Sequence, residues 1–361
     1  MSRLRTEGAG SAREAAAVGV GAFIGCQPFY GFHLALCWGI GRLLRLNRLK
    51  VYLAANISNP FLAPFLILTE VQLGAWLNRG TTHPLTLSAM KAMDPWVFGG
   101  DLLIGSLAVG TVLGIIGAAV TYSATRSQDP FFVALVERAS DRYLGRSLLA
   151  WEYGRGKLFR DPIYKTLVCD GVMPSGGTLV DVGCGQGLML ALLIAAADTA
   201  DDEWPSNGPR PPRFDRLIGI ELRPNVARLA HELLGDRAEI STADASAATL
   251  ARFDVAVMVD VLHMMPAAKQ VELIERLKTC LAPNGVMLIR EADAAAGWRY
   301  AVVRSVNWIQ AARQGNGRAP FHFRSREDWL TLLSQCGLAA EVVEHEGVGR
   351  LGNLLFRARL P

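Results

Sequence analysis

The chain has 361 residues, of which 51% are hydrophobic and 19% charged, whereas a typical soluble globular chain carries about 25% charged residues. This composition argues against a wholly soluble protein, and the length leaves room for two or three domains. The net charge of +4 lies entirely in residues 1–125, which hold nine Lys or Arg and five Asp or Glu, so we expect membrane lipid with anionic headgroups as a partner. No nucleic acid is predicted, because neither a basic helix nor a platform of aromatic and basic residues is apparent.

Residues 1–125 are predicted to form an all-α transmembrane domain. Three stretches lack Asp, Glu, Lys and Arg, namely Ala15–Gly41, Val51–Thr69 and Leu102–Thr125, and a bilayer core needs about 20 apolar residues in a helix. The third stretch fits best. Its small residues Gly110 and Gly114 either let two helices approach closely or simply belong to a Gly-rich apolar helix.

The first apolar stretch is interrupted at "GCQPFYGFH", Gly25–His33, where proline and glycine oppose a continuous helix. Basic residues lie on both sides of the stretch: Arg3, Arg5 and Arg13 before it, and Arg42, Arg45, Arg48 and Lys50 after it. Because basic residues favour the cytoplasmic side, both ends of the stretch should face it, as a re-entrant helical hairpin allows. The second stretch would then cross outward and the third return, which places everything after residue 125 in the cytoplasm.

The second stretch carries polar residues within an apolar span. "NISNP", Asn56–Pro60, lies inside it and Glu70 follows it. A hydrogen-bonded break and a lipid or substrate cavity both explain such groups, and the alternatives stay open. Residues 10–125, through "GVGAFIGCQPFYGFH" and "RLNRLKVYLAANISNP", are similar to a bacterial membrane-domain family of unknown function. That resemblance implies a multi-pass protein of the cell inner membrane.

Residues 126–175 are predicted to be a helical linker and lid, and residues 176–361 an α/β domain. Apolar runs that alternate with helical patterns predict a doubly wound, mostly parallel sheet, with an antiparallel hairpin at its end. The seven predicted strands are residues 178–183, 216–222, 238–242, 253–260, 285–291, 340–347 and 353–360. Asp198–Arg213 is polar and is interpreted as a loop insertion.

The first predicted strand runs into "DVGCGQG", which places Asp181, Gly183, Gly185 and Gly187 in one loop. A dinucleotide fingerprint needs G-x-G-x-x-G, but Leu188 or Leu190 stands at the last glycine position. An acid before the loop repels a pyrophosphate and attracts an ammonium group. The loop therefore indicates a cationic ligand without phosphate.

Further acids follow the next three strands in order: Glu221, Asp244 and Asp260. Ligands of such sheets bind at the carboxyl ends of the strands, where a carboxylate can hold ribose hydroxyls. S-adenosylmethionine, with an amino acid end, a sulfonium and an adenosine, has the required character. Any one of these acids alone could equally be a loop acid or a helix cap.

This ordered set resembles the class I S-adenosylmethionine-dependent methyltransferases over residues 175–361. The resemblance implies a Rossmann-like seven-stranded methyltransferase sheet of strand order 3-2-1-4-5-7-6 and S-adenosyl-L-methionine as cofactor. Gly183 and Gly185 would contact the methionine moiety, Glu221 the ribose and Asp244 the adenine. The implied cofactor-binding residues are Asp181, Gly183, Cys184, Gly185, Gly187, Glu221, Leu222, Asp244, Ala245 and Asp260.

Catalytic candidates depend on the acceptor, because a base is needed only for a hydroxyl that must lose its proton. His263, just past Asp260, and His322 are the candidates, although a lone histidine is more often structural. Tyr153, in the predicted lid, could face the sulfonium or the acceptor. Lys157 and Asp161 are spaced to pair on one helix face.

The segment Gly297–Trp308, with Arg299 and several aromatic residues, is either an acceptor site or a core helix. Together with the lid, the glycine loop and "DVLHMM", it is similar to bacterial methyltransferases found beside aryl-polyene and fatty-acid-like synthesis enzymes. This implies O- or C-methylation of a lipophilic, aromatic or acyl-type small molecule. The alternative is a lipid-binding or transport module with a non-catalytic S-adenosylmethionine sensor. The six scattered cysteines form no CxxC pair, and no metal site is predicted.

Overall fold

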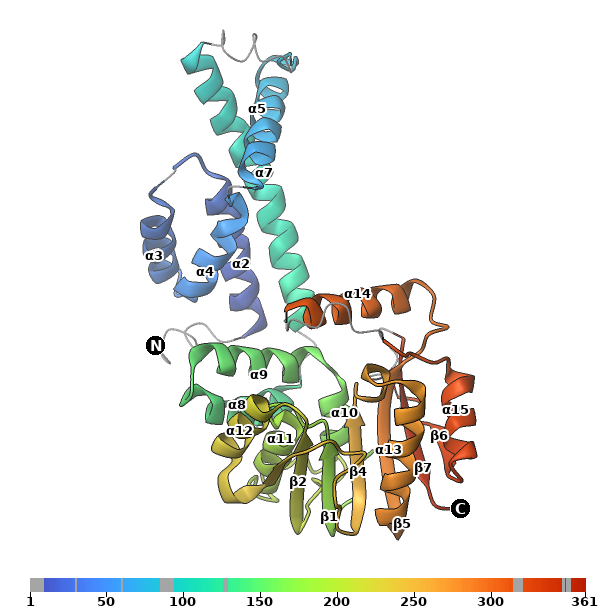
Figure 1. The fold of residues 1–361 in the computed structure, drawn as a ribbon. Helices are drawn as coiled ribbons and strands as arrows, with labels where there is room; N and C mark the ends of the chain where they lie inside the picture. The colour runs from blue at the N-terminus through green and yellow to red at the C-terminus, as the bar shows by residue number, and fades with distance from the viewer. Residues whose placement is uncertain are drawn as a thin grey trace. The chain divides into compact units, whose positions relative to one another are not determined.

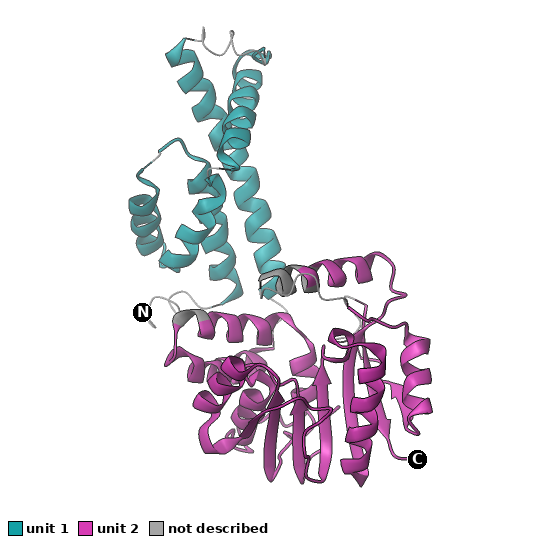
Figure 2. Ribbon diagram, viewed as in Figure 1, with its two compact units in different colours: residues 1–128 teal, residues 129–361 magenta. Residues whose placement is uncertain are grey.

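The computed structural model describes residues 10–29, 31–59, 61–84, 94–125, 129–313, 321–345, 348 and 352–361. The chain divides into two compact units, residues 1–128 and 129–361 (Figure 2). Arg3, Arg5 and Pro60, which entered the membrane prediction, lie outside the described residues.

The first unit is helical throughout its described part (Figure 1). Its helices are α2 (Ser11–Cys26), α3 (His33–Leu43), α4 (Arg48–Ala55), the short 3-10 helix η1 (Asn56–Ser58), α5 (Ala63–Arg79) and α7 (Pro95–Thr125). Among the described residues, α7 is the one helix that is long and apolar enough to cross a membrane. The segments Arg48–Ser58 and Ala63–Arg79 (α4 with η1, and α5) would form a second such span if the two are taken together as one bent span. The first apolar stretch is broken between Cys26 and His33, as its sequence suggests. The re-entrant hairpin and the orientation stay predictions.

Glycines allow α7 to pack closely against α2 and α5. A Cβ atom built on Gly114 would lie 2.8 Å from the carbonyl oxygen of Gly19, and one on Gly105 would lie 1.7 Å from that of Glu70. Contacts this short between a Cβ and backbone atoms are not tolerated. A Cβ on Gly110 would lie 3.2 Å from the carbonyl oxygen of Phe23 and 2.9 Å from the side-chain nitrogen of Gln27. Both Gly110 and Gly114 therefore let α7 approach α2 closely, as one of the two interpretations expected.

We expect Gly105→Val to destabilise the first unit, because the new side chain must displace the α5 backbone at Glu70. Overpacking of this kind typically costs about 1–3 kcal/mol of unfolding free energy. Thermal unfolding of the full chain in detergent measures the effect. Gly99→Val is the matched control, since a Cβ at Gly99 of the same helix meets nothing within 4 Å. Equal melting of both variants would contradict the packing described here.

The second unit is built around one seven-stranded sheet in the order β3-β2-β1-β4-β5-β7-β6, which confirms the strand order that the resemblance to class I methyltransferases implied. The strands are β1 (Thr178–Val182), β2 (Arg216–Glu221), β3 (Glu239–Thr242), β4 (Phe253–Val259), β5 (Leu281–Ala292), β6 (Ala339–Val342) and β7 (Asn353–Arg359). β1 to β5 pair in parallel, whereas β7 runs antiparallel to both β5 and β6. The predicted antiparallel hairpin is thus also confirmed.

Helices cover both faces of this sheet because successive residues of each buried strand point to opposite sides. Leu179, Val255 and Leu288 belong to one core cluster, whereas their neighbours Val180, Ala256 and Met287 belong to the other. The first cluster takes in α8 (Pro130–Leu144), α9 (Leu148–Arg160), α10 (Ile163–Cys169), α11 (Leu188–Ala197) and α12 (Pro224–Leu234). The second takes in α13 (Ala267–Cys280) and α15 (Arg326–Gln335).

Two segments outside the sheet, residues 126–175 and Asp198–Arg213, were given expected structures from the sequence. Residues 126–175, expected as a linker and lid, supply α8, α9 and α10 of the second unit. Asp198–Arg213 contains no regular helix or strand, so the predicted insertion is a loop. Its buried Trp204 donates to the carbonyl of Pro209 (2.7 Å) and packs edge-on against Phe131 of α8.

Candidate active site

The glycine loop joins β1 to α11 through three residues with positive φ: Gly183 (72°), Gly185 (57°) and Gly187 (76°). This backbone conformation favours glycine, because other residues pay a steric penalty there. A Cβ on Gly183 would press on Val261, and one on Gly187 would press on Leu234, whereas one on Gly185 would meet nothing within 4 Å. The first and third glycines therefore allow close packing, and Gly185 borders open space.

Three hydrogen bonds fix the loop from outside. Backbone amides of Gly183 and Cys184 donate to the carbonyl oxygen of Ile220 (2.8 and 3.0 Å). The buried Tyr143 of α8 donates its hydroxyl proton to the carbonyl of Gln186 (2.8 Å). Burial holds the pKa of the Cys184 thiol far above its ordinary value, so the thiol stays protonated.

Asp181 and Glu221 lie at the ends of neighbouring strands, and both are 5% exposed. Burial, together with the nearby charge of Glu221, raises the pKa of Asp181 to about 7. Burial alone would raise the pKa of Glu221 too, but hydrogen bonds from Arg223 outweigh it and hold that pKa below its ordinary value. Glu221 also accepts from the amide of Gly185 (3.0 Å), so it couples the loop to β2.

These residues fit S-adenosylmethionine and not a dinucleotide. Gly185 leaves room beside the loop for a ligand, and the buried carboxylate of Asp181, once ionised, favours a cationic group there over a phosphate. The arginine that neutralises Glu221 could not be foreseen: the Arg223 side chain bonds one carboxylate oxygen of Glu221 at 2.8 Å and the other at 3.3 Å.

The remaining predicted cofactor contacts are less enclosed. Asp244 is exposed and folds onto its own turn, where it accepts from the amide and hydroxyl of Ser246 (2.9 and 2.8 Å). These bonds lower the pKa of Asp244, and the arrangement matches the loop-acid alternative. Leu222 is 66% exposed and Ala245 is half-buried, so neither forms part of a closed pocket wall.

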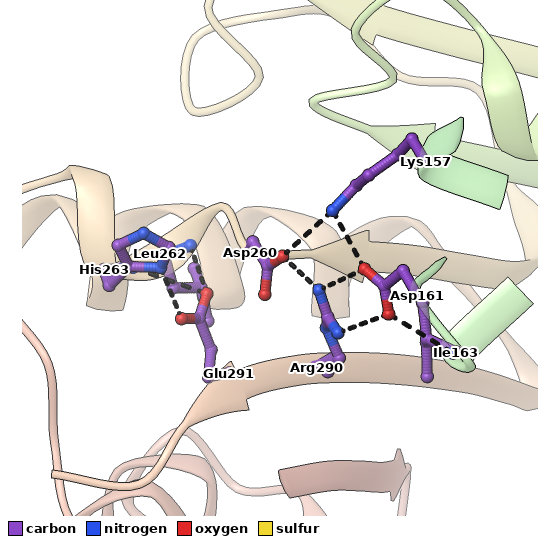
Figure 3. A network of polar contacts seen from close by, with 8 residues as sticks. All are labelled: Lys157, Asp161, Ile163, Asp260, Leu262, His263, Arg290 and Glu291. Atoms are coloured by element: carbon purple, nitrogen blue, oxygen red, sulfur yellow. Dashed lines mark hydrogen bonds and ion pairs between the residues drawn. The ribbon is translucent and has the colours of Figure 1, made fainter. Parts of the chain in front are cut away.

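Asp260 belongs to an ion-pair network that the sequence did not predict (Figure 3). Arg290, at the end of β5, binds Asp161 with both terminal nitrogens (2.8 and 2.9 Å) and also bonds Asp260. The predicted pair between Lys157 and Asp161 is present at 2.9 Å. Because Asp161 ends α9, the network ties this helix to the carboxyl ends of β4 and β5.

His263 is not the lone histidine that its sequence context suggested. Its Nδ1 lies 2.7 Å from a carboxylate oxygen of Glu291, and both side chains are buried (Figure 3). The other Glu291 oxygen accepts from the amide of Leu262 (2.6 Å). Burial disfavours the imidazolium, but the charge and hydrogen bond of Glu291 outweigh it and raise the pKa of His263 above its ordinary value.

Apart from its bond to Glu291, the His263 ring has aromatic neighbours. Phe323 stacks on the ring with centroids 4.5 Å apart, and Phe321 lies at 5.8 Å. Nε2 is buried and has no hydrogen-bond partner within the described part of the chain. The base candidate also lies two residues from Val261, which packs against Gly183 of the glycine loop.

Two other catalytic candidates take different places. His322 touches this region through its backbone, since its amide donates to the carbonyl of His263 (2.8 Å) and its carbonyl accepts from Gln270 (2.9 Å). Tyr153 is 55% exposed on α9.

We expect affinity for S-adenosylmethionine to rise with pH between about 6 and 7.5, up to about tenfold per unit, because the ligand's ammonium binds the ionised form of Asp181. Without ligand the same raised pKa works against folding: stability present below the ordinary Asp pKa is lost as pH rises towards 7. Calorimetry of the full chain in detergent at several pH values measures the affinity.

Asp181→Asn should give weak binding that no longer changes with pH. Asp244→Asn is the matched control: the pKa of Asp244 is lowered, so this carboxylate is ionised throughout the range and the slope should persist in the variant. A slope that survives in Asp181→Asn would show that another group titrates.

Comparisons with known proteins address both units. The model of a family described as "Methyltransferase domain" matches residues 151–344, and that of a family described as "Uncharacterized protein conserved in bacteria (DUF2062)" matches residues 2–129. No curated protein matches the chain.

Solved structures with similar folds include three of biosynthetic or ligand-bound proteins. The pyocyanin biosynthetic protein PhzM is 18% identical, with 66% of this chain and 64% of that chain covered and a TM-score of 0.42. The mitomycin 7-O-methyltransferase MmcR is 18% identical (96% and 94% covered, TM-score 0.43), and the DhpI–SAH complex is 13% identical (64% and 98% covered, TM-score 0.38). The match to PhzM therefore spans just under two thirds of that protein.

Proposed function

Because the chain belongs to the methyltransferase-domain family, we propose that it is a membrane-anchored enzyme that methylates a lipophilic small molecule. The methyltransferase domain follows a DUF2062 domain in the same chain, and its methyl donor is S-adenosylmethionine. The acceptor we propose is an aromatic or acyl-type molecule that carries a hydroxyl group.

The residues around the glycine loop are proposed to hold the donor. Asp181 and the backbone at Gly183 and Gly185 would take the methionine end, Glu221 the ribose and Asp244 the adenine. The open space beside Gly185 and the buried carboxylates of Asp181 and Glu221 support this assignment. Arg223 would have to release part of Glu221 when the ribose hydroxyls bind.

One observation carries the proposal of O-methylation: the buried pair of His263 and Glu291, with Nε2 left without a partner in the described residues. Bound S-adenosylmethionine supplies a methyl group already activated by the sulfonium. Nε2 of His263 would accept the proton of the acceptor hydroxyl as the oxygen becomes a nucleophile. Glu291 holds the ring orientation and stabilises the imidazolium, and Phe321 and Phe323 exclude water from it.

The first unit is proposed to keep the enzyme beside a substrate dissolved in the bilayer. α7 has the length and apolar character of a membrane span, and three residues separate its end from Asp129, where the second unit begins. A span at α7 therefore tethers the methyltransferase domain at the cytoplasmic face of the inner membrane, in the orientation that the flanking basic residues favour.

The test supplies labelled S-adenosylmethionine to membranes containing the full chain and identifies the labelled product. Transfer of label to a hydroxyl of a lipid-extractable small molecule is the expected result. Binding of the donor without transfer to any membrane component would favour the sensor alternative. No binding would remove both functions.

A further inference from the structure

A core helix was one of the two expectations for helix α14 (Trp298–Arg313), but none of its side chains that the structure describes is buried. Trp298 is 69% exposed, Val302 42% and Trp308 56%, so the core-helix interpretation is wrong. α14 also carries three arginines and no Asp or Glu, so it is a basic helix, contrary to the expectation that the chain has none.

Five exposed residues of α14 share one face, which is apolar apart from one serine. Positions 298, 301, 302, 305 and 308 follow the i, i+3, i+4, i+7 spacing of one helix side, and they are Trp298, Ala301, Val302, Ser305 and Trp308. Arg299 and Arg304 are exposed at opposite borders of this face, and the guanidinium of Arg299 lies 5.8 Å from the Trp298 ring centroid. Tryptophans on an apolar face with arginines at its borders are the pattern of a helix that lies in a membrane interface.

The opposite face of α14 reaches the candidate active site. Tyr300 is half-buried and packs edge-on against Phe323 with ring centroids 5.3 Å apart. Phe323 in turn stacks on His263. One side of the helix therefore borders the catalytic base candidate while the other presents apolar and basic residues to the outside.

We infer that α14 docks on the anionic surface of the bilayer and sets the acceptor side of the active site against the lipid. The arginines, with no acid on the helix, give charge complementarity to anionic headgroups, and Trp298, Val302 and Trp308 enter the boundary between headgroups and acyl chains. The inference rests on the proposed membrane anchoring, because a span at α7 would tether the second unit, which begins at Asp129, to the bilayer. The acceptor would then pass directly from the lipid, past α14, to His263.

The experiment places the full chain in nanodiscs of phosphatidylcholine alone or with about 30% phosphatidylglycerol, and follows hydrogen–deuterium exchange of the amides of residues 298–313. We expect at least about fivefold slower exchange in the anionic discs, and loss of this protection at about 1 M salt, where the Debye length is about 3 Å. Arg299→Gln combined with Arg304→Gln should abolish the difference between the two lipids.

Arg228→Gln combined with Arg252→Gln is the matched control, since both arginines are exposed outside α14; the lipid difference should persist. Affinity for S-adenosylmethionine shows whether each variant is folded. Equal exchange in both lipids overturns the inference, as does stronger protection by duplex DNA than by anionic discs. If the α14 amides exchange equally in both lipids but methyl transfer is intact, the docking is overturned and the proposed function stands. If the amides are protected in anionic discs but no methyl transfer occurs, the proposed function is overturned and the docking stands.

Discussion

Replacing Glu221 by glutamine is expected to weaken binding of S-adenosylmethionine by about a hundredfold. The variant keeps the size of the side chain but loses the charge proposed to accept from two ribose hydroxyls. A hydrogen bond to a charged group contributes about 1.5–3 kcal/mol, and each 1.36 kcal/mol changes affinity tenfold. Isothermal calorimetry of the full chain in detergent gives the dissociation constant directly.

Arg223→Gln provides the contrast to this variant. Arg223 donates to both oxygens of Glu221, so it competes for the atoms that the ribose is proposed to need. Its removal should leave affinity unchanged or improve it, while the hydrogen bond from the Gly185 amide still positions Glu221. Equal loss in both variants would mean that Glu221 acts only as a support of the loop.

Replacing His263 by alanine is expected to lower methyl transfer to a hydroxyl acceptor by about 10²–10⁴-fold, the usual contribution of a general base. The affinity for S-adenosylmethionine should stay within about twofold, because the acids proposed to hold the donor do not bond His263. Initial rates of label transfer in membranes, at saturating donor, measure the effect. An unchanged rate would exclude His263 as the base and favour an acceptor that needs none.

Glu291→Gln tests whether the carboxylate acts through the histidine. The pKa of His263 is raised by Glu291, and only the neutral ring can accept a proton, so activity should fall on the acid side of that raised pKa. Without the carboxylate charge, the acid limb of the pH profile should move to lower pH, in addition to a lower maximal rate. A merely structural Glu291 would lower the rate without moving the limb.

The strands of the sheet could be predicted because each one is recognisable from a few consecutive residues. Each buried strand is a short apolar run closed by turn residues, and seven such runs in sequence correspond to the seven strands. The error at β5 has a local cause as well: Pro283 and Asn284 resemble a turn, so the strand was expected to start at residue 285 and in fact starts at Leu281. A proline is accepted there before the regular pairing of Val286 with Val255.

The site was only partly predictable, since its decisive contacts join residues distant in the sequence. Arg290 and Asp161 are 129 positions apart, and no spacing rule connects them. Glu291 offered one signal that was overlooked: an acid at the buried end of an apolar strand needs a partner, and His263 is that partner. In α14, a mostly apolar sequence suited a core helix as well as an exposed one, so exposure had to come from the fold.

The hydrogen bond of the Tyr143 hydroxyl limits where the chain can be cut to separate the second unit from the first. α8, the first helix of the second unit, contributes this tyrosine hydroxyl to the carbonyl of Gln186 in the glycine loop and buries Phe132, Leu135 and Val136 in the core. A fragment cut at residue 151, where the family match begins, would lack that helix and leave the loop backbone unsupported. The smallest fragment that folds with an intact glycine loop should therefore start near Asp129, where the second unit begins.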